Sequence, residues 1–186
     1  MRIISGFLKG RSINFLKNAN TRPLKDSVRE SIFNILKHSN LIKIKIKDSN
    51  VLDLYSGIGS FGIECISRGA NKVTFIEKDF NAIKILKENL TRLSIANNSE
   101  VYDKKIEKIL VNNINEKFNL FFLDPPFSDF NFFQNLELIK KKKIFKKNHI
   151  LILHREKKVN DDFKDLFKII ERKKYGRSQI IFGEFN

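Results

Sequence analysis

The hydrophobic positions of this 186-residue chain fall into short apolar runs separated by stretches with helical spacing. The apolar runs predict buried strands at 51–54, 73–76, 99–102, 119–123 and 150–154. Apolar residues spaced three and four apart predict helices between them, at 60–68, 79–92, 104–113 and 130–141. Strands that alternate with helices are typical of an α/β domain in which helices cover both faces of a mostly parallel sheet.

The two ends of the chain depart from this alternation. Two further strands are predicted at 168–173 and 179–183, and the join Tyr175-Gly176-Arg177 is too short for a parallel crossover. We therefore expect a mostly parallel seven-stranded sheet whose last strand is antiparallel. Near the other end, a polar region that contains glycines precedes a helix predicted at 27–37, and the lysine-rich segment 43–48 is a connector.

A glycine-rich loop follows the first predicted strand. Gly57, Gly59 and Gly62 satisfy the pattern G-x-G-x-x-G, which brings backbone N–H groups at a helix N-terminus close to an anionic ligand. Asp53 ends the strand before the loop, and its carboxylate would repel the pyrophosphate of a dinucleotide. That carboxylate suits the ammonium and sulfonium groups of S-adenosylmethionine. A cap of the loop or of the next helix is the alternative role for Asp53.

Two further acidic residues follow the next strands. Glu77 ends the second strand and could accept hydrogen bonds from both ribose hydroxyls of a cofactor, whether a nicotinamide or a methyl donor. A surface pair with Lys78 or Lys84 is the alternative for Glu77. Asp103 follows the third strand and could bind the amino group of an adenine, although a turn-capping role explains it equally well.

The fourth strand runs directly into Asp124-Pro125-Pro126-Phe127. The amino group attached to a base ring is a poor nucleophile, because its lone pair is delocalised into the ring. The Asp124 carboxylate and the Pro125 carbonyl could each accept one of its N–H groups and aim the lone pair at a methyl donor. The prolines stiffen these acceptors, and Phe127 offers a face on which an extruded base can stack. A simple proline turn is the alternative, which the glycine loop and the earlier strand-end acids disfavour.

The chain is strongly basic, with 36 basic and 21 acidic residues, and this balance favours polyanionic partners. Arginine contacts phosphate through two parallel hydrogen bonds, and four arginines fall within the first 29 residues: Arg2, Arg11, Arg22 and Arg29. We interpret this segment as a nucleic-acid contact surface. Pairing of Arg22 and Arg29 with Asp26 or Glu30 is the alternative. The lysine-rich segment 140–147 is more typical of a solvated helix end than of a binding patch.

A single cysteine, Cys65, cannot form an internal disulfide, which fits a reducing cytoplasm. No apolar run approaches the length of a membrane span, and the opening sequence MRIISGFLKG lacks the apolar core of a signal peptide. We therefore expect a cytoplasmic protein without a membrane partner and without a metal site.

With these residues in hand, the sequence resembles the RsmD-type 16S ribosomal RNA guanine-N2 methyltransferases over nearly its whole length. The glycine loop Asp53-Leu-Tyr-Ser-Gly-Ile-Gly and the tetrapeptide at 124–127 are shared by many methyltransferases. More specific matches are Arg2-Ile-Ile-Ser-Gly with Lys9-Gly-Arg11, Thr21-Arg-Pro, Asp26, Val28-Arg-Glu30, Phe33-Asn34, Ser67-Arg-Gly-Ala70 and Tyr175-Gly176. The chain departs from the family pattern at Tyr102-Asp103-Lys104-Lys105, where the resemblance does not define which residue contacts the adenine ring.

The resemblance implies the class I (Rossmann-like) methyltransferase fold with a small N-terminal hairpin extension. Residues 1–40 would form that extension and 41–186 the catalytic domain. The implied substrate is N2 of a guanine in 16S ribosomal RNA, within the small ribosomal subunit or its assembly intermediate, and the implied cofactor is S-adenosylmethionine. The implied cofactor contacts are Asp53, Tyr55, Ser56, Gly57, Gly59, Glu77, Asp103, Thr21 and Arg22, and the implied RNA contacts are Arg2, Lys9, Arg11, Arg22 and Arg29.

Three other functions are open to the sequence. A DNA adenine-N6 methyltransferase would use the same tetrapeptide, although the chain leaves no room for a separate target-recognition region. A non-catalytic RNA-binding assembly factor could keep the fold, although the intact tetrapeptide argues against it. A nicotinamide oxidoreductase is disfavoured by the acidic residue before the glycine loop.

Overall fold

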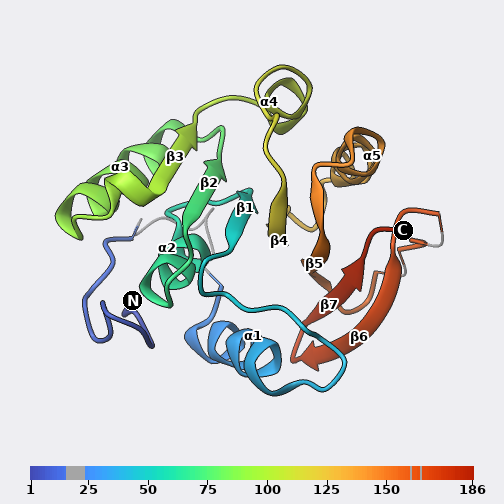
Figure 1. Ribbon diagram of the computed structural model, residues 1–186, viewed down its shortest axis with the longest axis horizontal. Coiled ribbons are helices and arrows are strands. Elements are labelled where there is room, and N and C mark those ends of the chain that lie inside the picture. The colour runs from blue at the N-terminus through green and yellow to red at the C-terminus, as the bar shows by residue number, and fades with distance from the viewer. Residues whose placement is uncertain (16–23, 160, 164) are drawn as a thin grey trace.

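The computed structural model of this protein describes residues 1–15, 24–159, 161–163 and 165–186, which form a seven-stranded sheet with helices on both faces (Figure 1). The strands are β1 Asn50–Leu54, β2 Lys72–Ile76, β3 Ser99–Tyr102, β4 Phe118–Leu123, β5 Phe145–Glu156, β6 Lys168–Tyr175 and β7 Ser178–Glu184. Their order across the sheet is β3-β2-β1-β4-β5-β7-β6. The strand order reverses between β1 and β4, because β2 and β3 follow on one side of β1 and β4 and β5 on the other. Open α/β sheets bind their ligands at such a topological switch point.

The sheet is parallel from β3 to β5, and β7 runs antiparallel to both of its neighbours, β5 and β6. The predicted α/β architecture with an antiparallel last strand is thereby confirmed. The tight turn at Gly176, whose φ is +55°, joins β6 to β7. One boundary differs from expectation: β5 begins at Phe145, so the end of the lysine-rich segment 140–147 is strand and not helix end. The pairing of Phe118 with Phe145 fixes this additional strand, and a local apolar pattern does not reveal such a partner.

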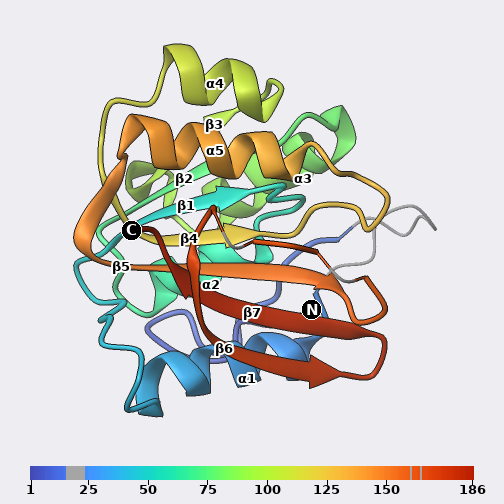
Figure 2. The ribbon, with the colours of Figure 1, turned by 90° about the vertical axis from the view of Figure 1, so that its right-hand side faces the viewer.

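The helices are α1 Asp26–His38, α2 Ser60–Ser67, α3 Phe80–Arg92, α4 Ile106–Asn112 and α5 Phe132–Lys142, with a short 3₁₀ turn at Ala96–Asn98. The first three helices cover one face of the sheet, and α4 and α5 cover the other (Figures 1 and 2). Alternate residues of the central strands point to opposite faces, so Val51 packs on the side of α2 and Leu52 on the side of α4. Two apolar cores result, one on each face.

A stack of three phenylalanine rings ties the N-terminal helix to the sheet. Phe61 of α2 lies between Phe33 of α1, at 5.1 Å between ring centroids, and Phe122 of β4, at 4.0 Å. All three side chains are buried, and buried aromatic pairs stabilise a core beyond the area that they remove from water. Helix α1 therefore shares the core of the sheet, and the division of the chain at residue 40 remains a prediction.

The N-terminal residues form the expected hairpin, with a bridge between Arg2 and Ser12. The hairpin is anchored to α2, because the backbone N–H groups of Ile4 and Ser5 donate to the Glu64 carboxylate at 2.8 and 2.9 Å. Glu64 is fully buried and also accepts from Arg68 at 2.8 Å, the helix-supporting pair that its spacing indicates. The carboxylate thus joins two segments that are about 60 residues apart, which the i,i+4 pattern alone does not predict.

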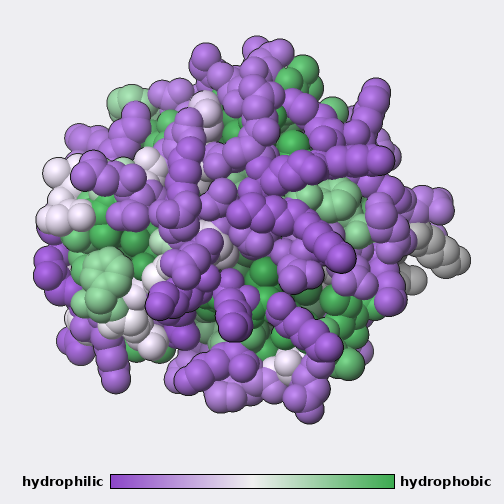
Figure 3. Space-filling model, viewed as in Figure 1, coloured by the Kyte–Doolittle hydropathy of each residue, from purple (hydrophilic) through white to green (hydrophobic). Residues whose placement is uncertain are grey.

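Figure 3 shows the face at which the parallel strands begin, and hydrophilic side chains cover most of it. Helices long and apolar enough to cross a membrane are absent from the described part of the chain.

Candidate active site

The residues that the sequence singles out gather where the parallel strands end, on the right-hand side of Figure 2. Strand β1 leads into the glycine loop, β2 ends just before Glu77, and β4 ends at Leu123, just before Asp124. Parallel neighbours place these ends side by side, because Leu54 pairs with Ile76 on one side and with Leu123 on the other. The loop, the acid and the tetrapeptide therefore lie together at the carboxyl ends of the parallel strands.

The loop between β1 and α2 needs backbone conformations that glycine adopts most readily. Gly57 and Gly59 have φ of +53° and +82°, and Tyr55 also lies in the left-handed region at +58°. Gly59 is the residue before α2, and a Cβ added there would lie 2.4 Å from a methyl carbon of Leu86. Glycine at this position therefore allows α3 to pack against the loop. The buried Ser56 hydroxyl lacks a hydrogen-bond partner among the described residues.

Asp53 lies beneath this loop and is 1% exposed. One carboxylate oxygen, Oδ2, accepts the N–H of Gly62 in the first turn of α2 at 3.0 Å. The other oxygen, Oδ1, is buried without a partner among the described residues. Burial raises the pKa of this carboxyl well above its usual range, and the hydrogen bond from Gly62 opposes the shift only in part. The helix cap is therefore observed, and direct contact between Asp53 and a cofactor remains a prediction.

Glu77 faces the glycine loop and binds backbone N–H groups. Its Oε2 accepts from Gly57 at 2.8 Å, and its Oε1 accepts from Lys78 and Asp79 at 2.8 and 2.9 Å. The carboxylate thus ties the end of β2 to the loop after β1, and the alternative role, a surface pair with the side chain of Lys78 or Lys84, is not observed among the described residues. Asp103, the predicted adenine contact, is exposed after β3. Its role remains a prediction.

A cavity of about 80 Å³ opens beside Glu77, between the end of β2 and the starts of α4 and α5. Tyr55 lines it, and its hydroxyl accepts a hydrogen bond from the Asn135 side chain at 2.9 Å. Burial raises the pKa of the Tyr55 hydroxyl, which therefore stays neutral at physiological pH. The cavity places a neutral aromatic ring next to an acidic strand end. That arrangement suits the nucleoside part of a cofactor.

The Asp124-Pro125-Pro126-Phe127 segment leaves β4 with its first residue still attached to β1, because Asp124 N donates to Leu54 O at 3.4 Å. The Asp124 side chain is 25% exposed, so a ligand can reach it. Its Oδ1 is 2.7 Å from Nδ1 of His154, and the described residues place no donor on Oδ2. Pro125 is buried and Phe127 is half-buried. Asp124 thus has one oxygen bound to the protein and one available.

Sequence reasoning missed His154, which follows Leu153 near the end of β5. The pairing of Leu123 with Leu153 places the next residues of the two strands, Asp124 and His154, beside each other. The His154 ring also meets Phe127 edge to face, at 5.6 Å between centroids. Within the apolar run at 150–154 the histidine is a terminal polar residue. Its partner becomes apparent only once the register of β4 and β5 is known.

The next residue, Arg155, holds the same segment from the opposite face of the sheet and was also missed. Its side chain is fully buried, and its Nε donates to Asp161 at 2.8 Å. Its two terminal nitrogens lie 3.4 Å from the carbonyl oxygens of Pro126 and Phe127. The guanidinium also stacks 4.4 Å from the centroid of the Phe132 ring. Two consecutive residues of β5 therefore support the tetrapeptide from both sides.

The predicted RNA-contacting residues separate into two groups. Arg2, Lys9 and Arg11 are exposed on the N-terminal hairpin. Arg29 is fully buried, and its Nη2 donates to Asp26 Oδ1 at 3.0 Å and to the Arg2 carbonyl at 2.6 Å. The assignment of Arg29 to RNA contact is therefore corrected: the guanidinium joins α1 to the hairpin and is not accessible to a phosphate.

Thr21 and Arg22, assigned to cofactor and RNA, lie outside the described residues.

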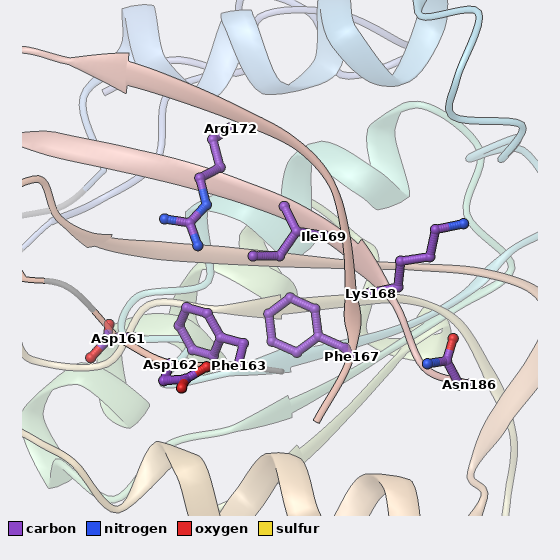
Figure 4. Close-up of a pocket in the computed structure, with 8 residues that line it drawn as sticks. All are labelled: Asp161, Asp162, Phe163, Phe167, Lys168, Ile169, Arg172 and Asn186. Atoms are coloured by element: carbon purple, nitrogen blue, oxygen red, sulfur yellow. The ribbon is translucent and has the colours of Figure 1, made fainter. Parts of the chain in front are cut away.

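A second and larger cavity, about 640 Å³, lies at the far edge of the sheet (Figure 4). In it, Arg172 and Ile169 of β6 face Phe163 and Phe167, which precede that strand (Figure 4). It contains none of the residues that the sequence singles out. Its size alone does not make it the active site, because the acids, the glycine loop and the tetrapeptide all lie elsewhere.

Groups of three or more histidine, cysteine or acidic side chains arranged to hold a metal ion are absent from the described residues.

Comparison with known proteins identifies the family. The family model "Conserved hypothetical protein 95" matches residues 1–184. Ribosomal RNA small subunit methyltransferase D of Haemophilus influenzae is 36% identical over 160 residues, which cover 84% of this chain and 79% of that protein. The protein of the same name from Buchnera aphidicola subsp. Acyrthosiphon pisum is 35% identical over 156 residues, which cover 84% and 78%.

A solved structure supports the same assignment. The protein yhhF from Escherichia coli has a TM-score of 0.84 and 26% identity to this chain, and the match covers 100% of this chain and 98% of yhhF. The fold thus agrees with a relative over the full length. This chain therefore belongs to the family described as Conserved hypothetical protein 95, the RsmD-type family that its motifs indicate.

Proposed function

We propose that this protein transfers a methyl group from S-adenosylmethionine to N2 of a guanine in small-subunit ribosomal RNA. The observation that carries the proposal is the Asp124 carboxylate, which has one oxygen held by His154 and one available to a ligand. Asp124 and the glycine loop both lie at the carboxyl ends of the parallel strands, and the chain belongs to the RsmD-type family. The names of the relatives point to the substrate, a small-subunit ribosomal RNA.

The residues at the carboxyl ends of β1 and β2 fit the cofactor. Asp53 Oδ1 and the Ser56 hydroxyl are buried polar atoms without partners among the described residues, and such atoms are costly unless a ligand or water satisfies them. Glu77 and Tyr55 line the adjoining cavity, where the ribose and adenine would lie. When bound, S-adenosylmethionine supplies an electrophilic methyl group. The cationic end of the cofactor would favour the ionised form of Asp53 and so oppose the rise in pKa that burial causes, because the charges are opposite.

The chain's own residues prepare the target amine. Asp124 Oδ2 and the Pro125 carbonyl would each accept one N–H, which holds the nitrogen in a pyramidal geometry with its lone pair directed at the methyl donor. Phe127 would stack on the extruded guanine. The nitrogen becomes acidic once it carries a fourth substituent, so its proton can leave after the transfer. A negative charge on Asp124 stabilises that cationic stage.

The exposed hairpin residues Arg2, Lys9 and Arg11 would contact RNA phosphates. Ribosomal RNA within the small subunit or its assembly intermediate is the proposed partner, and the cytoplasm is the corresponding compartment. A DNA adenine would present a similar planar amine to Asp124. The ribosomal substrate is preferred because the relatives' names specify it.

The test is transfer of labelled methyl groups to small ribosomal subunits that lack the modification, followed by nucleoside analysis. N2-methylguanosine is the expected product. N6-methyladenosine, or label in DNA instead of RNA, would redirect the assignment, and the absence of transfer to any of these would leave a binding role. A thermal shift with S-adenosylhomocysteine but not with NAD is the expected cofactor result.

Variants of Asp124 test the mechanism. Asp124→Asn keeps a carbonyl acceptor and should retain measurable single-turnover activity. Asp124→Ala removes the acceptor and should lose at least about a hundredfold, the scale for one preorganised electrostatic contact. Both variants should bind S-adenosylhomocysteine with unchanged affinity. Equal inactivity of the two variants would mean that the negative charge itself is required.

A further inference from the structure

The Asp124–His154 hydrogen bond links the end of β4 to the end of β5, and the surrounding structure holds both residues in place. His154 pairs with Ile180 of β7, and the preceding Leu153 pairs with Leu123 of β4, so strands on both sides hold the backbone at this end of β5. The His154 side chain is only 13% exposed, and its edge-to-face contact with Phe127 restricts rotation of the imidazole ring further. The ring nitrogen that faces Asp124 is therefore held in one place.

The geometry defines which atom donates. An ionised carboxylate can only accept, so the 2.7 Å contact requires that Nδ1 carries the hydrogen. The other ring nitrogen, Nε2, is buried without a partner among the described residues. His154 is thus held in the ring orientation in which Nδ1 donates to Asp124.

This hydrogen bond determines where the second carboxylate oxygen points. A carboxylate that is held by neither oxygen turns about its Cβ–Cγ bond, and at 25% exposure Asp124 has access to water. With Oδ1 bound to a fixed donor, Oδ2 occupies one direction. The proposed reaction needs that direction, since Oδ2 and the Pro125 carbonyl must accept two hydrogens of the same amine.

We infer that His154 is a positioning residue that donates a hydrogen bond from Nδ1 to Asp124 and orients its free oxygen toward the target amine. The inference rests on the proposed function, because the amine defines the direction that matters. His154 acts through Asp124 and does not itself touch the base. Its contribution should consequently be found in the rate of methyl transfer and not in cofactor affinity.

Two substitutions separate this role from a packing role. In His154→Asn the amide nitrogen takes the position of Nδ1 along the side chain and can still donate, whereas His154→Leu keeps bulk and removes the donor. The single-turnover rate on small subunits should fall about tenfold to a hundredfold in the leucine variant, the range for a hydrogen bond to a charged group. It should fall less than about threefold in the asparagine variant. Binding of S-adenosylhomocysteine, measured by calorimetry, should be unchanged in both.

A matched control lies on the same strand. His149 is near the other end of β5, where its ring contacts the carbonyl of Lys146 and the N–H of Phe185 at 2.8 and 2.9 Å. His149→Leu removes a half-buried histidine with similar hydrogen bonds and should lower the unfolding temperature without slowing methyl transfer. If His149→Leu slows the reaction as much as His154→Leu does, the effect is general destabilisation of β5 and the inference fails.

A double-mutant cycle tests the route of the effect. In the Asp124→Ala background there is no acceptor for Nδ1, so adding His154→Leu should change the remaining rate less than about threefold. A full tenfold loss in that background, or wild-type activity in His154→Leu alone, would overturn the inference. Equal loss in the asparagine and leucine variants would also overturn it. A wild-type protein that methylates no nucleic acid would instead refute the proposed function.

Discussion

Breaking the buried ion pair between Arg155 and Asp161 should cost more stability than breaking an exposed ion pair of this molecule. The guanidinium is fully buried, and the Asp161 carboxylate is 3% exposed on its side chain. Removal of one member of such a pair leaves the other charge buried and unpaired, at a cost of about 3–5 kcal/mol. We therefore expect Asp161→Ala to lower the free energy of unfolding by that amount. In a domain of this length it corresponds to a fall in Tm on the order of 6–20 °C.

The two single variants should differ, because the partners are held differently. Arg155 belongs to β5, pairs with Gln179 of β7 and is fully buried, so its charge stays in the core when Asp161 is lost. Asp161 lies outside the strands and can turn toward water when Arg155 is lost. Asp161→Ala should therefore destabilise the protein more than Arg155→Leu. The double variant, which buries no charge, should be more stable than Asp161→Ala alone.

Denaturant unfolding, followed by two spectroscopic probes, measures these differences. The comparison pair is Lys168 and Glu184, whose side chains are 66% and 41% exposed and whose contact is 3.5 Å. Glu184→Ala should change stability by less than about 1 kcal/mol, as exposed ion pairs do. If Asp161→Ala also falls within about 1 kcal/mol of the wild type, the loss of Asp161 leaves no costly buried charge and the reasoning is wrong.

Three further predictions follow from the same structure. Burial raises the pKa of Asp53, so the folded state keeps that proton to higher pH than the unfolded state does. As the pH rises above about 4, the free energy of unfolding of the wild type should therefore fall relative to that of Asp53→Asn. Parallel plots of unfolding free energy against pH for the two proteins would contradict this. Gly59→Ala should destabilise by about 1–2 kcal/mol or more in denaturant unfolding, from its positive φ and the 2.4 Å approach to Leu86. Replacement of Arg2 and Arg11 with alanine should flatten the log–log salt dependence of RNA binding by somewhat less than one unit each, and an unaltered slope would remove them from the RNA surface.

Local patterns predicted the elements of the fold well. Apolar runs located the central strands, and the short join around Gly176 correctly required an antiparallel pair. These features depend on residues that are close together in the sequence, so local patterns are enough to predict them. Strand ends were less accurate where a partner strand extends the pairing, as Phe145 shows opposite Phe118.

The supporting residues of the site could not be predicted in the same way. His154 and Arg155 stand next to each other at the end of an apolar run, yet one contacts Asp124 and the other contacts Asp161 and the tetrapeptide carbonyls. Those partners depend on strand register and on opposite faces of the sheet. Arg29 was misassigned for a related reason: its carbonyl partner, that of Arg2, comes from a separate segment. Arginine is rarely buried without such a partner.

The insertion of β7 between β5 and β6 affects how the protein can be made. Chains emerge from the ribosome N-terminus first, so the outer edge of β5 and the whole of β6 wait for residues 178–184 to complete their hydrogen bonds. Until then the unpaired edges of β5 and β6 are exposed to other nascent chains, and such edges favour aggregation. His154 lies on one of those edges, opposite Ile180. The backbone of His154 is therefore fully paired on this side only after β7 has formed, which places this part of the proposed site among the last to be completed.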